Sequence, residues 1–263
     1  MLAARSAFSR VNSAAAQYTG ERGSMSKPSA PDIPTPPAAS PDPHAGFAPL
    51  LAGTPLHEAR YALVLVHGRG GTAQGMLPIA RAARATDAAL VALVAAEQSW
   101  YPERFLSPRA ANEPWLGSAL ASVGAAVDQV RAAGIPTGQI ILAGFSQGAC
   151  LVLEYAAVAA AAHARFGGVA AFAGALIGDP AVPRHDHGSL GGTPVVLACG
   201  DADVHIPEAI VRSSASVFRS LHAAVDLRIY PGVGHDIVAD QLQALADLAA
   251  TLRGAQSGAH LPR

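Results

Sequence analysis

The stretch "QIILAGFSQGACLVLEYAAVAAAA", residues 139–162, joins a short aliphatic run to a long Ala- and Leu-rich segment through a serine between two glycines. The run Gln139–Ala143 has the length and composition of a buried strand, and Gln147–Ala162 has the composition of a helix. Ser146 stands at the junction. A Gly-x-Ser-x-Gly sequence between a strand and a helix is typical of a nucleophile on a sharp turn, so this stretch predicts α/β packing and a reactive serine.

Short apolar runs alternate with longer helical patterns from residue 60 onward. The predicted strands are Tyr61–Val66, Ala89–Ala95, Gln139–Ala143, Gly168–Ala173, Pro194–Ala198 and Val225–Tyr230. The predicted helices are Met76–Ala85, Trp115–Ala133, Gln147–Ala162, Pro207–His222 and Ile237–Arg253. The strand runs are almost continuously apolar, as in strands covered on both faces. This order predicts one domain, residues 51–254, with a mostly parallel sheet between two layers of helices.

Both ends of the chain differ from this domain in composition. Residues 28–49 read "PSAPDIPTPPAASPDPHAGFAP", and so high a proline content opposes helices and central strands. We expect residues 1–50 to form a disordered Pro/Ala-rich leader and residues 255–263 a flexible tail. Residues 1–20 contain arginines, serines and alanines but no acidic residue, as transit peptides do. We favour the alternative that translation starts at Met25.

Composition excludes several classes of function. The net charge of −1 provides no electrostatic basis for binding nucleic acid, and Lys27 is the only lysine. The apolar stretches are interrupted well before the roughly 18 residues that a membrane-spanning helix needs, so we expect a soluble protein without stable membrane insertion. Cys150 and Cys199 fall in apolar segments. We expect two buried free thiols rather than a disulfide, which fits a reducing cytoplasm.

A serine hydroxyl needs a general base and an acid that orients the base, and two loops after predicted strands carry such groups. The stretch "GDADVHIP", residues 200–207, follows one strand, and "PGVGHDI", residues 231–237, follows the next. The carboxyl ends of parallel strands meet at one edge of the sheet, so these loops should approach Ser146. The order serine, aspartate, histidine along the chain is the one expected of such a nucleophile turn.

Each loop offers alternatives. Asp203 lies further into its loop than Asp201, which stands in a Gly-Asp turn where aspartate is common for local reasons, and we favour Asp203 as the acid. We favour His235 as the base because it follows Gly234 and precedes a helix. His222 falls in a predicted helix, and His205, two residues after Asp203, is expected to line the site.

Two backbone N–H groups are predicted to stabilise an oxyanion. Gln147 begins the helix after Ser146, where N–H groups lack partners and the helix dipole is positive. The second donor should come from the turn after an early strand. Here "LVLVHGRGGTA", residues 63–73, places Arg69 between glycines. Its guanidinium is either solvated or free to steer an anionic substrate.

The sequence resembles the phospholipase/carboxylesterase family of α/β-hydrolases, which includes bacterial carboxylesterases and acyl-protein thioesterases. The matching stretches are "HGRGG" (67–71), "GFSQG" (144–148), "GDADVHIP" (200–207) and "GVGHD" (232–236). The resemblance implies a three-layer α/β-hydrolase fold without a large lid. It also implies ester hydrolysis through an acyl-enzyme, with no cofactor and no metal. The implied site residues are Ser146, Asp203 and His235 as the catalytic triad, with the N–H groups of Arg69 and Gln147 as the oxyanion hole.

The segment "SWYPERFLSPRAANEPWLGSAL", residues 99–120, is closer to the bacterial branch of this family than to the thioesterases. Its aromatic residues could either wall a substrate pocket or pin the loop to the core. They are Trp100, Tyr101, Phe105 and Trp115. Metal binding by "RHDHG", residues 184–188, is not favoured, because adjacent ligands in one short loop do not complete a tetrahedral site.

The sequence is compatible with three functions. The leading hypothesis is a carboxylesterase that acts on small-molecule esters of short to medium acyl chain. A lysophospholipase or acyl thioesterase would use the same triad. A catalytically silent binding module with this fold is the alternative from another class. Assembly as a homodimer is left open.

Overall fold

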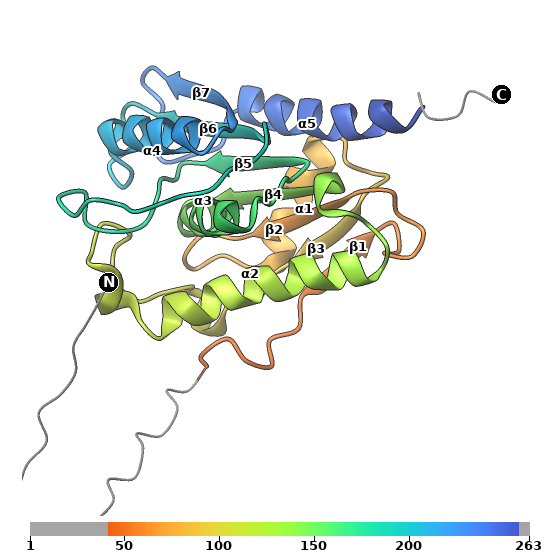
Figure 1. Ribbon diagram of the computed structural model, residues 1–263, viewed down its shortest axis with the longest axis horizontal. Coiled ribbons are helices and arrows are strands. Elements are labelled where there is room, and N and C mark those ends of the chain that lie inside the picture. Colours follow the sequence, from red (N-terminus) through yellow and green to blue (C-terminus); the bar gives the residue numbers. More distant parts are fainter. Residues whose placement is uncertain (1–41, 258–263) are drawn as a thin grey trace, which may run out of the picture. The chain divides into compact units, whose positions relative to one another are not determined.

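A central sheet with helices on both faces organises the computed structural model, which describes residues 42–257 and the side chains of residues 42–254 (Figure 1). The strands are β1 (Leu50–Gly53), β2 (Ala62–Val66), β3 (Ala89–Ala92), β4 (Ile140–Phe145), β5 (Gly168–Phe172), β6 (Pro194–Gly200) and β7 (Ala224–Tyr230). The α-helices are α1 (Ala73–Ala82), α2 (Trp115–Ala132), α3 (Gln147–Ala159), α4 (Glu208–Ser220) and α5 (Ala239–Ser257).

The sheet has the strand order β1-β3-β2-β4-β5-β6-β7. Strands β2 to β7 run parallel to their neighbours, and β1 pairs antiparallel with β3 at one edge. Parallel strands must return through crossovers, and the helices supply them. The predicted mostly parallel α/β-hydrolase fold is confirmed.

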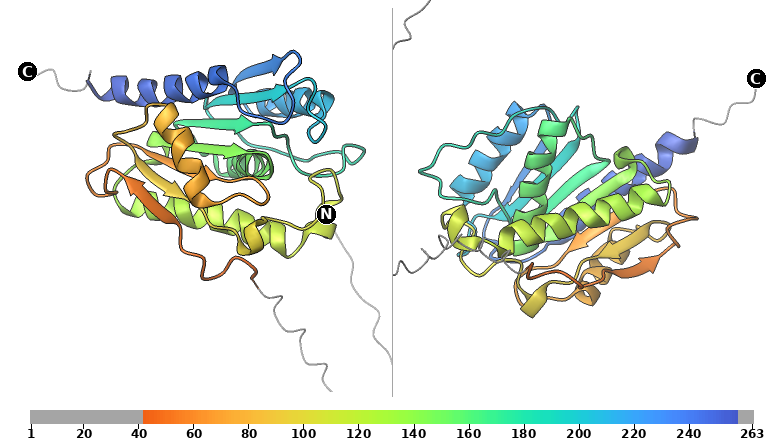
Figure 2. Two further views of the ribbon diagram at one scale, coloured as in Figure 1. Left: turned by 180° about the vertical axis from the view of Figure 1, so that it is seen from behind. Right: turned by 60° about the horizontal axis from the view of Figure 1, so that its bottom comes forward.

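Alternate residues of the central strands supply two separate cores. In β2, Val64 and Val66 belong to the core that α2, α3 and α4 cover, whereas Leu63 and Leu65 belong to the core that α1 and α5 cover. The same helices are seen from behind and from below in Figure 2. Because both faces are covered, every residue of β2 is buried, as the uninterrupted apolar run predicted.

The structure describes only part of the predicted leader, residues 1–50, and of the predicted tail, residues 255–263. Residues 1–41 and 258–263 lie outside the described residues, so the boundaries of the domain stay a prediction. Residues 42–49 lie against the domain: the backbone N–H of His44 donates to Ser118 Oγ at 2.9 Å, and its ring contacts the backbone of Ala96 and Trp100. Helix α5 continues to Ser257, into the segment predicted as a tail.

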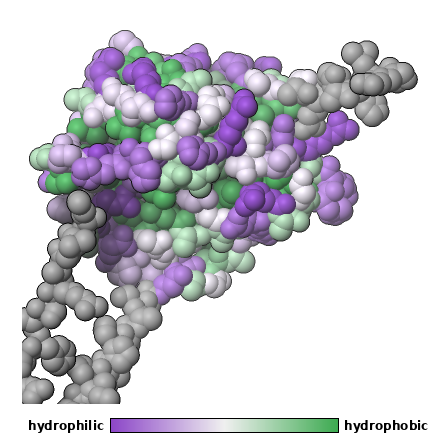
Figure 3. Space-filling model, viewed as in Figure 1, coloured by the Kyte–Doolittle hydropathy of each residue, from purple (hydrophilic) through white to green (hydrophobic). Residues whose placement is uncertain are grey.

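The surface shows no sign of a membrane-spanning element in the described part of the chain. None of its helices is long and apolar enough to cross a bilayer. On the face shown in Figure 3, hydrophilic side chains interrupt the hydrophobic ones throughout.

Candidate active site

Ser146 lies on the sharp turn between β4 and α3. Its backbone has φ 54° and ψ −120°, a left-handed conformation that residues with a Cβ rarely adopt. The neighbouring structure holds it there, since the Ser146 N–H donates to Phe172 O at 2.9 Å and its carbonyl accepts from Cys150 N at 3.0 Å. The turn therefore stores backbone strain and raises the side chain above the end of the sheet.

The two glycines of "GFSQG" permit this turn by their lack of side chains. A Cβ at Gly148 would overlap the carbonyl oxygen of Val66, and a Cβ at Gly144 would overlap that of Gly148. The start of α3 is thus packed directly against the end of β2. This contact explains why both positions are glycine and why Ser146 lies next to the Gly-rich turn after β2.

Ser146, His235 and Asp203 are hydrogen-bonded in series. His235 Nε2 lies 2.8 Å from Ser146 Oγ, and His235 Nδ1 lies 2.7 Å from Asp203 Oδ2. The other oxygen of Asp203 accepts from the N–H groups of His205 at 2.8 Å and Ile206 at 3.0 Å. The structure thus brings together the three residues predicted from loops after β4, β6 and β7.

The electrostatics of Asp203 define the proton arrangement. Burial by itself raises the pKa of this carboxyl, but the hydrogen bonds from His235 and from two backbone N–H groups outweigh burial, so the pKa lies below its ordinary value. An ionised carboxylate only accepts hydrogen bonds, so His235 Nδ1 carries the proton. Nε2 is then free to accept the hydroxyl proton of Ser146.

Asp201, the alternative acid, has a different role. Its Oδ1 accepts from the N–H of Gly232 at 2.7 Å, and its backbone N–H donates to Tyr230 O at 3.1 Å. Both contacts tie the β6 loop to the turn that precedes His235. Asp201 is exposed and supports the loop, whereas Asp203 is the carboxylate that reaches the imidazole.

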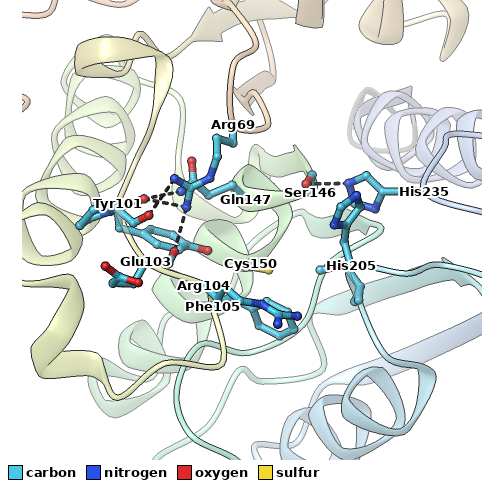
Figure 4. A pocket seen from close by; sticks show the side chains of 12 residues that line it. Arg69, Tyr101, Glu103, Arg104, Phe105, Ser146, Gln147, Cys150, His205 and His235 are labelled. Atoms are coloured by element: carbon cyan, nitrogen blue, oxygen red, sulfur yellow. Dashed lines mark hydrogen bonds between the residues drawn. The ribbon is translucent and has the colours of Figure 1, made fainter.

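The side chains of Arg69 and Gln147 are both fastened to one loop. The Arg69 guanidinium donates to the carbonyl oxygens of residues 101–103 at 2.8–2.9 Å (Figure 4). Gln147 Oε1 accepts from Trp100 N at 2.9 Å, and its Nε2 donates to Tyr101 O at 2.7 Å. The guanidinium is therefore neither simply solvated nor free to steer an anion. It fixes the backbone on which a predicted oxyanion donor lies.

Replacing Arg69 by methionine is expected to lower kcat/KM for an ester about tenfold or more. Methionine keeps the aliphatic stem but removes all the hydrogen bonds to the carbonyls of residues 101–103, and small displacements of positioned groups cost large factors in rate. Initial rates on p-nitrophenyl butyrate measure the effect. The matched control is Arg81→Met, at an exposed position on α1. Equal activity of the two variants would contradict a positioning role for the Arg69 side chain.

Ser146 opens into a cavity of about 440 Å³. Three of the predicted pocket residues line this cavity, namely Tyr101, Phe105 and His205. The ring of His205 packs edge-on against that of His235, with centroids 4.8 Å apart. Cavities of this size accommodate small ligands.

The two tryptophans of the same loop do not line the cavity. Trp100 is fully buried, and its indole N–H donates to His67 O at 2.8 Å. Trp115 begins α2 and packs edge-on against the ring of His44. Both pin the loop to the core, which was the other predicted role of these aromatics.

Cys150 was not predicted as a site residue, yet it lines the cavity. It follows Ser146 by four residues in the chain, and side chains four apart lie on one face of a helix. That spacing is a signal from which its place could have been found. Cys150 and Cys199 are both buried free thiols, and burial raises the pKa of each to about 12.

The "RHDHG" segment forms ion pairs. The Arg184 guanidinium donates to both Asp186 and the buried carboxylate of Glu154. Among the described residues, no three His, Cys, Asp or Glu side chains gather as metal ligands would. Asp186 is therefore a partner of Arg184 in this structure.

A mostly parallel sheet, with a serine raised at the end of β4 and a histidine and an aspartate on later loops, defines an α/β-hydrolase-like protein. Within that class, the chain belongs to the phospholipase/carboxylesterase family, which it matches over residues 53–252. The family is one of esterase hydrolases.

Two solved structures are similar to this chain. The chain is 38% identical to a phospholipase/carboxylesterase from Dyadobacter fermentans, with a TM-score of 0.74, covering 78% of this chain and 97% of that one. A carboxylesterase from Bacillus cereus shares the fold at 17% identity, with a TM-score of 0.61 over 79% of this chain and 95% of that one.

A curated relative is acyl-protein thioesterase 1 of Saccharomyces cerevisiae. The two are 29% identical over 131 residues, which are 49% of this chain and 56% of the yeast protein. The match thus spans little more than half the length of that relative.

Proposed function

We propose that the protein is a serine carboxylesterase that cleaves esters of short to medium acyl chain through an acyl-enzyme. The observation that carries the proposal is the hydrogen-bonded series from Ser146 Oγ through both nitrogens of His235 to the buried carboxylate of Asp203. A hydroxyl so connected can be deprotonated as it attacks, which a solvated serine cannot.

In the proposed mechanism, His235 Nε2 takes the proton of Ser146 while Oγ bonds to the ester carbonyl carbon. The resulting oxyanion accepts hydrogen bonds from the N–H groups of Arg69 and Gln147. His235 then gives its proton to the leaving alcohol as the carbon–oxygen bond breaks. Water, deprotonated by His235, releases the acid and restores Ser146.

The size of the cavity supports a proposal for the acyl chain, and a relative supports a proposal for the type of bond that is cleaved. A cavity of about 440 Å³ beside Ser146 suits a short or medium acyl chain. The yeast relative is named an acyl-protein thioesterase, which supports thioester hydrolysis by the same residues as a second candidate. Rates on butyryl esters, butyryl thioesters and lysophospholipids, measured side by side, separate these candidates.

A fluorophosphonate is expected to label the protein once, at Ser146, and to abolish hydrolysis of p-nitrophenyl butyrate in parallel. The reagent phosphonylates only a serine whose hydroxyl is activated by a neighbouring base, and fluoride leaves as the bond to Oγ forms. Intact-mass and peptide mass spectrometry measure the adduct and its position. A folded protein that neither reacts with the reagent nor hydrolyses the ester would instead be the catalytically silent binding module.

A further inference from the structure

Arg104 brings a positive charge to the wall of the cavity that holds Ser146. Within the part of the chain whose side chains are described, residues 42–254, its guanidinium makes no hydrogen bond and no ion pair. An exposed arginine is ordinarily solvated. Arg104 is exposed but also lines the concave site where a substrate lies, so a bound substrate replaces part of the water around its N–H groups.

Besides Arg104, one arginine and one glutamate line the cavity. The Arg69 guanidinium donates to three backbone carbonyl oxygens of the neighbouring loop. Glu103 precedes Arg104 in the chain, but the two side chains form no ion pair, and the Glu103 carboxylate points away from Ser146 (Figure 4). The Arg104 side chain extends instead toward the side of the cavity on which His205 lies (Figure 4). Its N–H groups are therefore available to a ligand.

The backbone that carries Arg104 is fixed by a buried side chain. Asn112 is 0% exposed, and its Oδ1 accepts from the Glu103 N–H at 2.8 Å while its Nδ2 donates to the Arg104 carbonyl oxygen at 3.3 Å. The carbonyl oxygen of Phe105 accepts from the N–H of Gly178 at 2.8 Å. The backbone of Arg104 is thus in place before a substrate binds, and only the side chain has to be ordered.

The chemistry of this group favours a carboxylate as its partner. A guanidinium offers two parallel N–H groups that match the two oxygens of a carboxylate, and such charge-assisted pairs are among the stronger hydrogen bonds. One guanidinium balances the single charge of a carboxylate, whereas a phosphate monoester carries about −1.5 to −2. Because Arg104 and Ser146 share one cavity of about 440 Å³, the carboxylate and the reacting ester belong to one small molecule.

We propose that Arg104 binds a carboxylate of the substrate, so that esters bearing a carboxylate are preferred to neutral esters of the same shape. This inference rests on the proposed esterase function and names the substrate class. The carboxylate belongs either to the acyl part, as in the monoester of a dicarboxylic acid, or to the alcohol part, as in the ester of a hydroxy acid. It takes no part in bond breaking: Ser146 attacks the ester carbonyl, the alcohol leaves with a proton from His235, and the carboxylate keeps its charge.

Two matched pairs of esters test the proposal. Monoethyl succinate is compared with ethyl 4-oxopentanoate, in which a methyl group replaces one carboxylate oxygen. The butyrate ester of glycolate is compared with that of hydroxyacetone, which differs by the same replacement on the alcohol side. In the pair whose carboxylate reaches Arg104, the wild-type kcat/KM is expected to be about tenfold or more higher for the charged ester. Acid release in a pH-stat measures the rates, and the responding pair identifies the part of the substrate that carries the carboxylate.

Substitutions of Arg104 remove the differences in intrinsic reactivity within a pair, because the same two esters are compared in each variant. Arg104→Met loses the charge and is expected to lower the charged-to-neutral ratio of kcat/KM about tenfold. Arg104→Lys keeps the charge but loses the paired N–H groups, so it should retain part of the ratio. The matched control is Arg81→Met, which removes an exposed arginine of α1 outside the cavity and should leave the ratio at the wild-type value.

Salt provides a second measurement. The screening length falls from about 10 Å at 0.1 M to about 3 Å at 1 M, and the exposed Arg104 is open to screening. The ratio should therefore fall over this range in the wild type and stay constant in Arg104→Met. A wild-type ratio that does not depend on salt would contradict a preference based on charge.

The outcomes separate the two proposals. If Arg104→Met keeps the wild-type ratio in both pairs, Arg104 does not bind a substrate carboxylate, while cleavage of the neutral esters leaves the esterase function standing. If the wild type cleaves no ester of either pair and the fluorophosphonate does not react with Ser146, the proposed function itself is wrong.

Discussion

Replacing Ser146 by alanine is expected to lower kcat for ester hydrolysis about 10⁶-fold while the protein stays folded. The change removes the hydroxyl that we propose attacks the ester, and groups that act as one catalytic unit lose most of their effect when the nucleophile is removed. The Cβ is retained, so the turn between β4 and α3 keeps its packing. Initial rates on p-nitrophenyl butyrate and the melting temperature measure the two expectations.

A companion variant makes this test sharper. Ser146→Gly also lacks the nucleophile, but glycine adopts φ 54° without the steric penalty that alanine retains. Relief of backbone strain stabilises the folded protein by about 1–3 kcal/mol. Part of this gain is offset because glycine increases the conformational entropy of the unfolded chain. We expect both variants to be inactive and the glycine variant to melt at the higher temperature. Turnover by both purified variants at the wild-type rate would exclude Ser146 as the nucleophile.

The strand, turn and helix around Ser146 could be predicted from the sequence because each segment has a distinctive composition. The run "QIILA" is too apolar to be exposed, the segment after Gln147 is too rich in Ala and Leu to be a loop, and only glycines permit the packing between them. Strand β4 nevertheless continues to Phe145, two residues beyond the prediction, because Gly144 and Phe145 pair with β5. Strand pairing is a tertiary contact that the local pattern does not contain.

The edge strand β1 was missed for a related reason. Leu50–Gly53 is only four residues long, half-exposed in alternation and preceded by the proline-rich segment. It forms a strand because its backbone pairs antiparallel with β3. A short edge strand of this kind is specified by its partner more than by its own composition.

The candidate site could be predicted in its chain order but not in its supporting contacts. Ser146, Asp203 and His235 each follow a strand end, and the topology alone brings them to one edge. The attachment of Arg69 and Gln147 to the Trp100–Glu103 loop depends on side-chain directions that no periodicity encodes. For the same reason the sequence did not distinguish two adjacent aromatic residues of that loop: Trp100 lies in the core, whereas Tyr101 lines the cavity.

Replacing Asp203 by asparagine is expected to lower kcat about 10⁴-fold with little change in KM. Asparagine has the shape of aspartate, but its amide N–H can donate a hydrogen bond to His235 Nδ1. Nδ1 must then be unprotonated, so the neutral imidazole carries its proton on Nε2. An Nε2–H facing Ser146 cannot accept the hydroxyl proton, and the corresponding change in serine-protease triads has an effect of this size. Steady-state rates on p-nitrophenyl butyrate measure it. The matched control, Asp201→Asn, keeps the oxygen that accepts from Gly232 N and should remain within a few-fold of wild type.

The same pair of variants has a stability signature that varies with pH. The pKa of Asp203 in the folded protein lies below its ordinary value, because the bonds from His235 and backbone N–H groups outweigh burial. Its carboxylate therefore stabilises the fold fully above the ordinary aspartate pKa, and that contribution is lost as pH falls through the lowered value. Urea unfolding at several pH values should show that the wild type has a larger free energy of unfolding than Asp203→Asn near neutrality. This difference should become smaller in acid. If this difference in free energy of unfolding did not change with pH, or if Asp201→Asn showed the same change, the Asp203 carboxylate would not be the ionised group that orients His235.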